Sequence, residues 1–289
     1  MEVVSPSSAC IPSIACYGFG MRALLFASLA VLTAAAWRPT ALEHGSLVIA
    51  MPVASGWVVC GDKRKNSTLF DATEDEVKVF ALARGVVAGA TGLRRVNEGV
   101  TLFDVVESVK SFHGTRPFDG RDDYVEALAK FLSAEFVRAV PPRIWPEIEA
   151  SAEQAPSVYT VMLFWTTGAG LPRWADVNFH LRGGPRYATR TTWDVLATSN
   201  KLRPVTIGNL AVVDELQHGF SPAFAEARRD PDIRRFLIAP YLWREHAADA
   251  AERFGRRLIE LTNARLPELQ SKADVGPVAD CLRAESRRV

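Results

Sequence analysis

Cysteine and the common catalytic motifs are scarce in this sequence. Only four of the 289 residues are cysteine, and none of them forms a CxxC pair. This excludes a zinc ribbon and a dense disulfide scaffold. The five histidines are scattered, and no HExxH motif, GxSxG motif or phosphate-binding glycine loop occurs. The sequence therefore predicts no metal site and no cofactor.

An excess of charge of either sign is also missing. The chain has 34 Lys and Arg against 33 Asp and Glu, a formal net charge of +1. Without an overall basic field, a nucleic-acid partner is disfavoured. With 48% hydrophobic residues the composition is that of a globular protein, and the length allows one large domain or two small ones.

The N-terminal part has the features of a secretory signal. Arg22 precedes an apolar run at 23–37, and Ala34 to Ala36 supply the small side chains that a signal peptidase accepts. The run is short for a membrane span. We therefore expect a leader at 1–36, with translation starting at Met21, and export to the periplasm or the outside. The alternative is a buried core helix or a retained anchor.

Two cysteines, Cys60 and Cys281, remain after removal of such a leader. In an oxidising compartment they could form a disulfide, since secreted proteins retain such bonds. Two buried free thiols are the alternative, because unpaired cysteine is among the most buried residue types. The sequence leaves both open.

The hydrophobic pattern predicts an α+β fold. Apolar runs separated by turn residues predict two hairpins, and spacings of three and four predict two amphipathic helices. Runs of strands and helices, rather than strict alternation, favour antiparallel sheets with helices outside. The predicted elements are hairpins at 46–60 and 77–91, helices at 100–111 and 121–140, strands at 158–165, 174–181 and 205–207, a helical block at 222–268 and an edge strand at 278–283.

One set of spacings resembles the N-terminal-nucleophile hydrolases of the proteasome β-subunit type. If Ser46 is the first residue of a mature chain, Asp62 lies 16 residues further on, Arg64 lies 18, Lys78 lies 32 and Gly92 lies 46. These are the offsets that the family uses. The resemblance implies a four-layer sandwich of two antiparallel sheets flanked by helices, formed by residues 46–289. It also implies a threonine-type peptidase in which serine replaces the usual threonine.

The chemistry gives each of these residues a role. An α-amino group has an unperturbed pKa of about 7.7–8.0, so a released Ser46 carries its own base beside its hydroxyl. An ammonium at Lys78 favours deprotonation of both groups, and Asp62 would orient that ammonium. The backbone N–H of Gly92 is suited to stabilising an oxyanion. Arg64 is expected to brace Asp62 and its turn.

Release of Ser46 requires a cut directly before it. Gly45 suits this step, because a residue without a side chain leaves its carbonyl open to the neighbouring hydroxyl. Residues 37–45 would then be a short propeptide, removed autocatalytically. Later in the chain, Asn209 and Asp274 stand near the places where the family has supporting polar residues, and a turn Asn and a loop Asp are equally good interpretations.

The resemblance implies a peptide or acyl-amide substrate and a homo-oligomeric ring. It leaves other readings open. The chain could be a catalytically inactive structural or scaffolding subunit of the same fold, in which Ser46 stays unprocessed. It could also be an amidase that acts on a small acyl amide. An enclosed pocket near Thr167 and Lys201 would favour this alternative. A binding module without chemistry is a more distant alternative.

Overall fold

In the computed structural model, residues Thr40–Val289 form one compact unit. The predicted leader and the first residues of the predicted propeptide, 37–39, lie outside the described residues. No helix in the described part is long and apolar enough to cross a membrane. The described residues are 40–45, 47–67, 69, 73–120, 122–151, 157–181, 187–194, 204–208, 211–219, 222–238, 245–269 and 275–285.

The smaller sheet is built around the first predicted hairpin. Every residue of its two central strands is buried, which explains their nearly unbroken apolar sequence. The predicted edge strand pairs with the second of them and closes one side. All neighbouring strands are antiparallel, in the order β11 (Val205–Gly208), β2 (Leu47–Val53), β3 (Gly56–Asp62) and β12 (Ala279–Glu285).

The larger sheet is organised by one long strand, β6 (Val86–Asn97). Its two edges are each shared by two shorter strands. Strand β5 (Val79–Ala83) and then β1 (Ala41–Gly45) pair along one edge, and β8 (Tyr159–Thr166) and then β7 (Thr101–Asp104) pair along the other. The remaining strands are β9 (Pro172–Leu181) and β10 (Tyr187–Asp194) beyond β8, and β4 (Lys65–Ser67) beyond β1.

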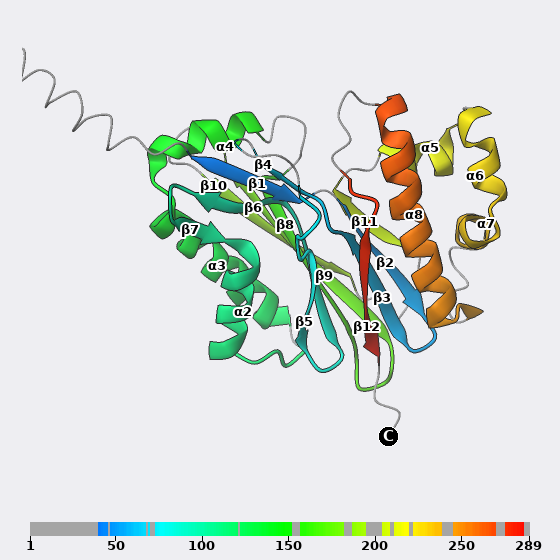
Figure 1. Ribbon diagram of the computed structural model, residues 1–289. Coiled ribbons are helices and arrows are strands. Elements are labelled where there is room, and N and C mark those ends of the chain that lie inside the picture. The colour runs from blue at the N-terminus through cyan, green and yellow to red at the C-terminus, as the bar shows by residue number, and fades with distance from the viewer. Residues whose placement is uncertain are drawn as a thin grey trace, which may run out of the picture. The chain divides into compact units, whose positions relative to one another are not determined.

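Helices cover the outer face of each sheet, as Figure 1 shows. One apolar core lies between the larger sheet and its helices, a second between the smaller sheet and its helices, and a third between the two sheets. The predicted sandwich of two antiparallel sheets flanked by helices is confirmed. The first helical layer holds α2 (Val105–Thr115), α3 (Asp122–Ala139), η2 (Pro142–Ile144) and α4 (Trp145–Ser151), and the second holds α5 (Ala211–His218), η4 (Pro222–Phe224), α6 (Ala225–Arg229), α7 (Pro231–Ile238) and α8 (Ala248–Leu269).

Several predicted elements need correction. The helix predicted at 100–111 is wrong at its start, because β7 occupies Thr101–Asp104. Asp104 then caps α2 by accepting hydrogen bonds from the backbone N–H groups of Val106 and Glu107. Helix α5 and the strands β1, β4 and β10 were not predicted from the sequence.

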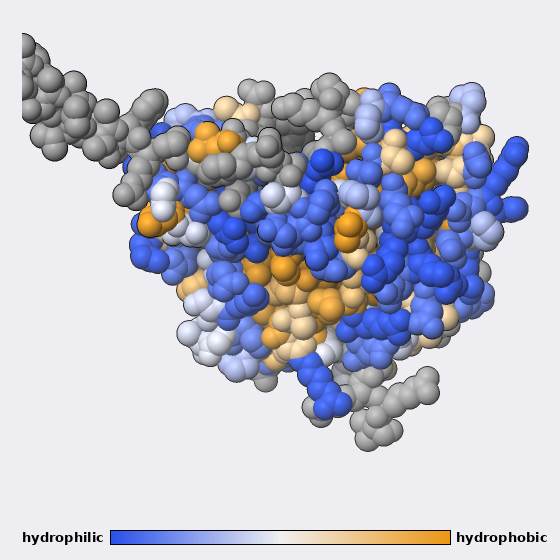
Figure 2. All heavy atoms as spheres, viewed as in Figure 1, coloured by the Kyte–Doolittle hydropathy of each residue, from blue (hydrophilic) through white to orange (hydrophobic). Residues whose placement is uncertain are grey.

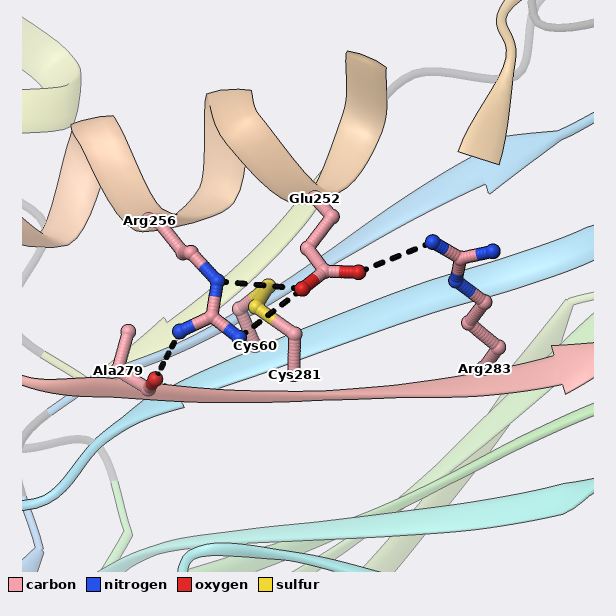
Figure 3. Close-up of a disulfide and its surroundings, with 6 residues drawn as sticks. All are labelled: Cys60, Glu252, Arg256, Ala279, Cys281 and Arg283. Carbon is pink, nitrogen blue, oxygen red and sulfur yellow. Dashed lines mark hydrogen bonds and ion pairs between the residues drawn. A yellow bond between two sulfur atoms is a disulfide. The ribbon is translucent and has the colours of Figure 1, made fainter. Parts of the chain in front are cut away.

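Cys60 and Cys281, whose pairing the sequence did not decide, form a disulfide. Cys60 on β3 and Cys281 on β12 are directly opposite each other in the antiparallel register. Helix α8 lies over this bond (Figure 3), and a Cβ atom on its Gly255 would come within 2.6 Å of the Cys60 Sγ. Arg256 of the same helix donates to the Ala279 carbonyl at the start of β12. The disulfide and α8 together fix the C-terminal strand to the sheet.

The edges of β5 and β12 adjoin on one side of the molecule. Figure 2 shows apolar residues gathered on this face between hydrophilic surroundings, over the region where Figure 1 places these two strands. The half-buried Leu282 of β12 packs against the core between the sheets. The apolar layer between the sheets therefore reaches the surface at this edge.

Candidate functional site

Asp62 is the centre of the polar cluster to which the sequence pointed. It is the last residue of β3, and its side chain is completely buried. One carboxylate oxygen accepts the backbone N–H of Leu47 at 2.8 Å, and the other lies 2.7 Å from the Nζ of Lys78. A buried carboxylate needs such partners, because desolvation penalises its charge.

Lys78 comes directly before β5 and is also buried. Desolvation of its ammonium lowers the pKa of Lys78 below the ordinary value, and the opposite charge of Asp62 counteracts part of this shift. Its backbone carbonyl accepts the N–H of Ala90 on β6 at 2.9 Å. Gly61 makes this close packing feasible, because a Cβ there would lie only 3.1 Å from the Cβ of Lys78.

Two more backbone N–H groups complete the surroundings of Asp62. Arg64 and Gly276 each donate to Oδ2 at 3.1 Å. The expectation that Arg64 braces Asp62 therefore needs refinement: the contact comes from its backbone, while its guanidinium Nε lies 3.6 Å from Glu74. Gly276 was not predicted as a partner, because no local pattern indicates a contact between residues 214 positions apart.

Gly92 faces the last residue of the predicted propeptide. It pairs with Gly45 of β1 on one edge of β6 and with Tyr159 of β8 on the other. Its φ of +79° favours glycine, and a Cβ at this position would lie 2.4 Å from the carbonyl oxygen of Val158. Both observations explain why this position requires a residue without a side chain.

Ser46 itself lies outside the described residues, but both of its neighbours are placed. Gly45 ends β1 in the larger sheet opposite Gly92, and Leu47 begins β2 in the smaller sheet with its N–H on Asp62. The two neighbours of residue 46 thus belong to different sheets. Leu47 bonds to Asp62, and Lys78 bonds to β6 only two residues before Gly92, so the end of β1 and the start of β2 both lie near the buried ion pair.

The two supporting residues proposed from the later sequence, Asn209 and Asp274, also lie outside the described residues. Described residues close to each of them in sequence lie near Asp62 and the start of β2. Gly208, the last residue of β11, pairs with Leu47, and Gly276 bonds to Asp62. Segments from four separate parts of the chain thus meet around the start of β2.

A second buried ionic cluster, which no sequence pattern predicted, lies beside the first. Arg94 on β6 pairs with Glu76 at 2.7 Å and with Asp104, and all three side chains are at most 7% exposed. Arg95 adds a second cation on Asp104 at 2.8 Å. Since Glu76 lies two residues before Lys78 and Arg94 two residues after Gly92, the cluster ties the Lys78 segment to β6.

The arrangement offers an ammonium, a carboxylate and a glycine backbone around one chain crossing, which are groups suited to acid–base and acyl-transfer chemistry. Within the described ranges, no three His, Cys, Asp or Glu side chains come together in a way that could hold a metal ion.

Comparisons with known proteins find matches among solved structures alone. No family model matches the chain, and no curated protein matches it. Among solved structures, the helical assembly of the Anbu complex from Pseudomonas aeruginosa is similar at 13% identity, over 83% of this chain and 81% of that one, with a TM-score of 0.48. Anbu (ancestral beta-subunit) from Yersinia bercovieri is similar at 14% identity, over 82% and 81%, with a TM-score of 0.42.

These findings correct the family assignment made from the spacing of Ser46, Asp62, Lys78 and Gly92. The similar structures belong to Anbu, which is a family distinct from the proteasome β-subunits, and no family model or curated relative supports the assignment. Four coincident offsets were thus wrong as evidence of membership. At these identities the likeness concerns the fold alone.

Proposed function

We propose that the chain is an amide-bond hydrolase, an endopeptidase or amidase, whose nucleophile is Ser46 once that residue has become the N-terminus. The observation that carries this proposal is the shared carboxylate of Asp62, which binds both the Leu47 N–H and the Lys78 ammonium. It links a buried cation to the residue that directly follows Ser46, and release of Ser46 would create a base on that serine itself.

In the proposed reaction, the Ser46 hydroxyl oxygen attacks the substrate carbonyl while the α-amine of the same residue accepts the hydroxyl proton. The Gly92 N–H donates to the oxyanion. Collapse breaks the amide bond, and the ammonium returns the proton to the departing amine. Water then hydrolyses the resulting ester and frees Ser46. Lys78 lowers the pKa of the α-amine through its positive charge, and Asp62 holds Lys78 in place.

Maturation would use the same hydroxyl, but not the α-amine, because that nitrogen is still part of the Gly45–Ser46 amide bond. Strand β1 holds Gly45 opposite Gly92, so the carbonyl before Ser46 is fixed by strand pairing. Attack by the Ser46 hydroxyl on that carbonyl moves the acyl group from nitrogen to oxygen, and water hydrolyses the ester. The products are a free amine at Ser46 and a carboxylate at Gly45.

A peptide is the favoured substrate class. Residues 41–45 form an extended strand that pairs with β6 on one side and β4 on the other. An extended peptide could take the same place after β1 has been released, because main-chain hydrogen bonding does not depend on sequence. A non-catalytic structural role remains the second candidate, since β1 is integrated into the larger sheet with its Leu42 fully buried.

Export and assembly belong to the same proposal. The leader at 1–36 would deliver the chain to the periplasm or outside, where the Cys60–Cys281 disulfide can form. Export is tested by fractionating cells and measuring the intact mass of the protein in each fraction, which shows whether the leader has been removed. Light scattering on the purified protein tests whether a homo-oligomeric ring forms.

Intact mass and N-terminal sequencing of the purified protein test the central claim. We expect the parent chain to begin at Ser46. Ser46→Ala should keep residue 45 attached, whereas Ser46→Thr retains the hydroxyl and should mature. Ser111→Ala, which changes an exposed serine of α2, is the matched control and should mature like the parent. A Ser46→Ala chain that begins at residue 46 would exclude Ser46 as the autocatalyst and favour the structural role.

A further inference from the structure

We propose that the mature enzyme selects peptides carrying an aliphatic side chain at the fourth residue before the cleaved bond, and that the place vacated by Leu42 is the pocket for it. The inference rests on the proposed function and adds its substrate class. It follows from how β1 is held, since the strand occupies the position that a peptide substrate would take over.

The backbone of β1 is bound on both sides, and its register ends at the cleavage site. Gly45 pairs with Lys65 of β4 and Gly92 of β6, and His44 pairs with Asn66 and Leu93. These contacts would give affinity for any extended peptide. Selectivity must come from side chains, which alternate between the two faces of a strand.

Leu42 is the one large aliphatic residue in the β1 sequence, and it is completely buried. It is opposite Val96 on β6, and Val96 is opposite Phe103 on β7. Directly paired residues of neighbouring strands point to the same face. Leu42, Val96 and Phe103 therefore form one row across three strands, facing the core beneath α2 and α3.

Packed aromatic side chains line the space beneath this row. The Phe103 ring packs against Phe136 of α3 at 5.2 Å and against Tyr159 of β8 at 5.8 Å between ring centroids. Departure of β1 would leave an apolar opening in this cluster. A substrate without an aliphatic side chain at the fourth residue before the cleaved bond would not fill this opening. Unfilled apolar space is unfavourable because the lining atoms lose their contacts.

The test in trans uses the mature enzyme, separated from its released segment, and fluorogenic amides of the peptide Thr-Ala-Leu-Glu-His-Gly, which copies residues 40–45. Each methylene missing from an apolar pocket reduces kcat/KM by about 10-fold or more. We expect a loss of at least about 10-fold when alanine replaces the leucine, and little change when methionine replaces it. Replacement of the histidine by alanine is the control and should have little effect.

The test in cis follows maturation of the chain itself. Leu42→Ala should slow release of Ser46 by a similar factor, and Leu42→Met should restore it. Leu128→Ala is the matched control, because Leu128 is equally buried in the same core but lies on α3. If Leu128→Ala slows maturation as much as Leu42→Ala, the effect is one of stability and the inference is overturned.

The outcomes separate this inference from the function on which it rests. If the parent matures and hydrolyses peptides but the leucine and alanine peptides react at equal rates, the specificity inference alone is wrong. If the parent neither matures nor hydrolyses any of the peptides, the proposed function fails and the inference with it.

Discussion

Gly276 donates its backbone N–H to the Asp62 carboxylate at 3.1 Å, although 214 residues separate the two in sequence. The contact makes the C-terminal segment part of the cluster that holds Lys78. It depends on the position of β12, which begins three residues later and pairs with β3. Whatever fixes β12 to β3 therefore also fixes one of the partners of Asp62.

The Cys60–Cys281 disulfide should accordingly support both stability and the site. A bond that closes so long a loop stabilises a fold by about 2–5 kcal/mol, mainly by restricting the unfolded chain. We expect reduction to lower the melting temperature and slow the maturation of Ser46. Thermal melts with and without reductant, and intact mass over time, measure the two effects.

The double variant Cys60→Ala/Cys281→Ala provides the control for reduction. It should melt below the oxidised parent and should not respond to reductant. A parent that melts at the same temperature in both conditions would show that β12 is held by its strand pairing and by α8 rather than by the disulfide.

Replacing Lys78 tests the buried ion pair. Lys78→Met leaves the carboxylate of Asp62 buried without its cation, which costs about 3–5 kcal/mol in comparable cases. We expect a large loss of unfolding free energy in urea and no release of Ser46. The double variant Asp62→Asn/Lys78→Met removes both charges and should regain much of the stability while remaining unprocessed. Maturation of the double variant would contradict the proposed role of Lys78.

The lowered pKa of Lys78 makes stability depend on pH in a defined direction. In the folded protein burial opposes the ammonium, whereas Asp62, Glu76 and Glu74 favour it, and the net shift is downward from 10.5. As pH rises from the folded pKa to that of the unfolded chain, the unfolded state binds more protons. The unfolding free energy contributed by Lys78 therefore increases across this window and is lowest below it.

Urea titrations at several pH values check this sign. The parent should gain stability, relative to Asp62→Asn/Lys78→Met, as the pH approaches 10.5 from below. Ionisable groups outside the Asp62–Lys78 pair are present in both proteins, so their contributions cancel in the difference to first order. Parallel curves for the two proteins would mean that the pKa of Lys78 is the same folded and unfolded.

The sequence alone was sufficient to predict the two hairpins, whereas the contact of Asp62 with Lys78 was expected only from the family resemblance. Strands β2 and β3 are buried on both faces, so their sequences are nearly unbroken apolar runs. Such runs are local signals, and local patterns can be read without the fold. The Asp62–Lys78 pair joins the end of β3 in one sheet to the start of β5 in the other, so no local pattern displays it.

The missed features depend on neighbours that the sequence does not display. Strand β1 is short and exists as a strand because β6 and β4 lie on either side of it. Leu102 stands at a helix-like spacing from the apolar residues that follow it, which is why residues 101–104 were assigned to a helix. Strand β6 extends beyond the end of β8, and β7 pairs with this remaining part of its edge. The contact of Gly276 with Asp62 spans most of the chain.

The cluster of Arg94, Glu76 and Asp104 should be a main source of stability beside the site. Arg94→Met leaves Glu76 buried without its cation and removes one cation from Asp104, which still has Arg95. Loss of one partner from a buried pair costs about 3–5 kcal/mol. Because Glu76 precedes Lys78 by two residues, we also expect slower release of Ser46.

Arg143→Met is the matched control, since Arg143 forms an ion pair with Glu98 at 2.7 Å but is 59% exposed. An exposed pair contributes about 0–1 kcal/mol, so this variant should unfold and mature like the parent. Urea denaturation and intact mass compare the two variants directly. If Arg94→Met were no less stable than Arg143→Met, the buried cluster would not secure the Lys78 segment to β6, and the order of that segment would have to come from the Lys78–Asp62 pair itself.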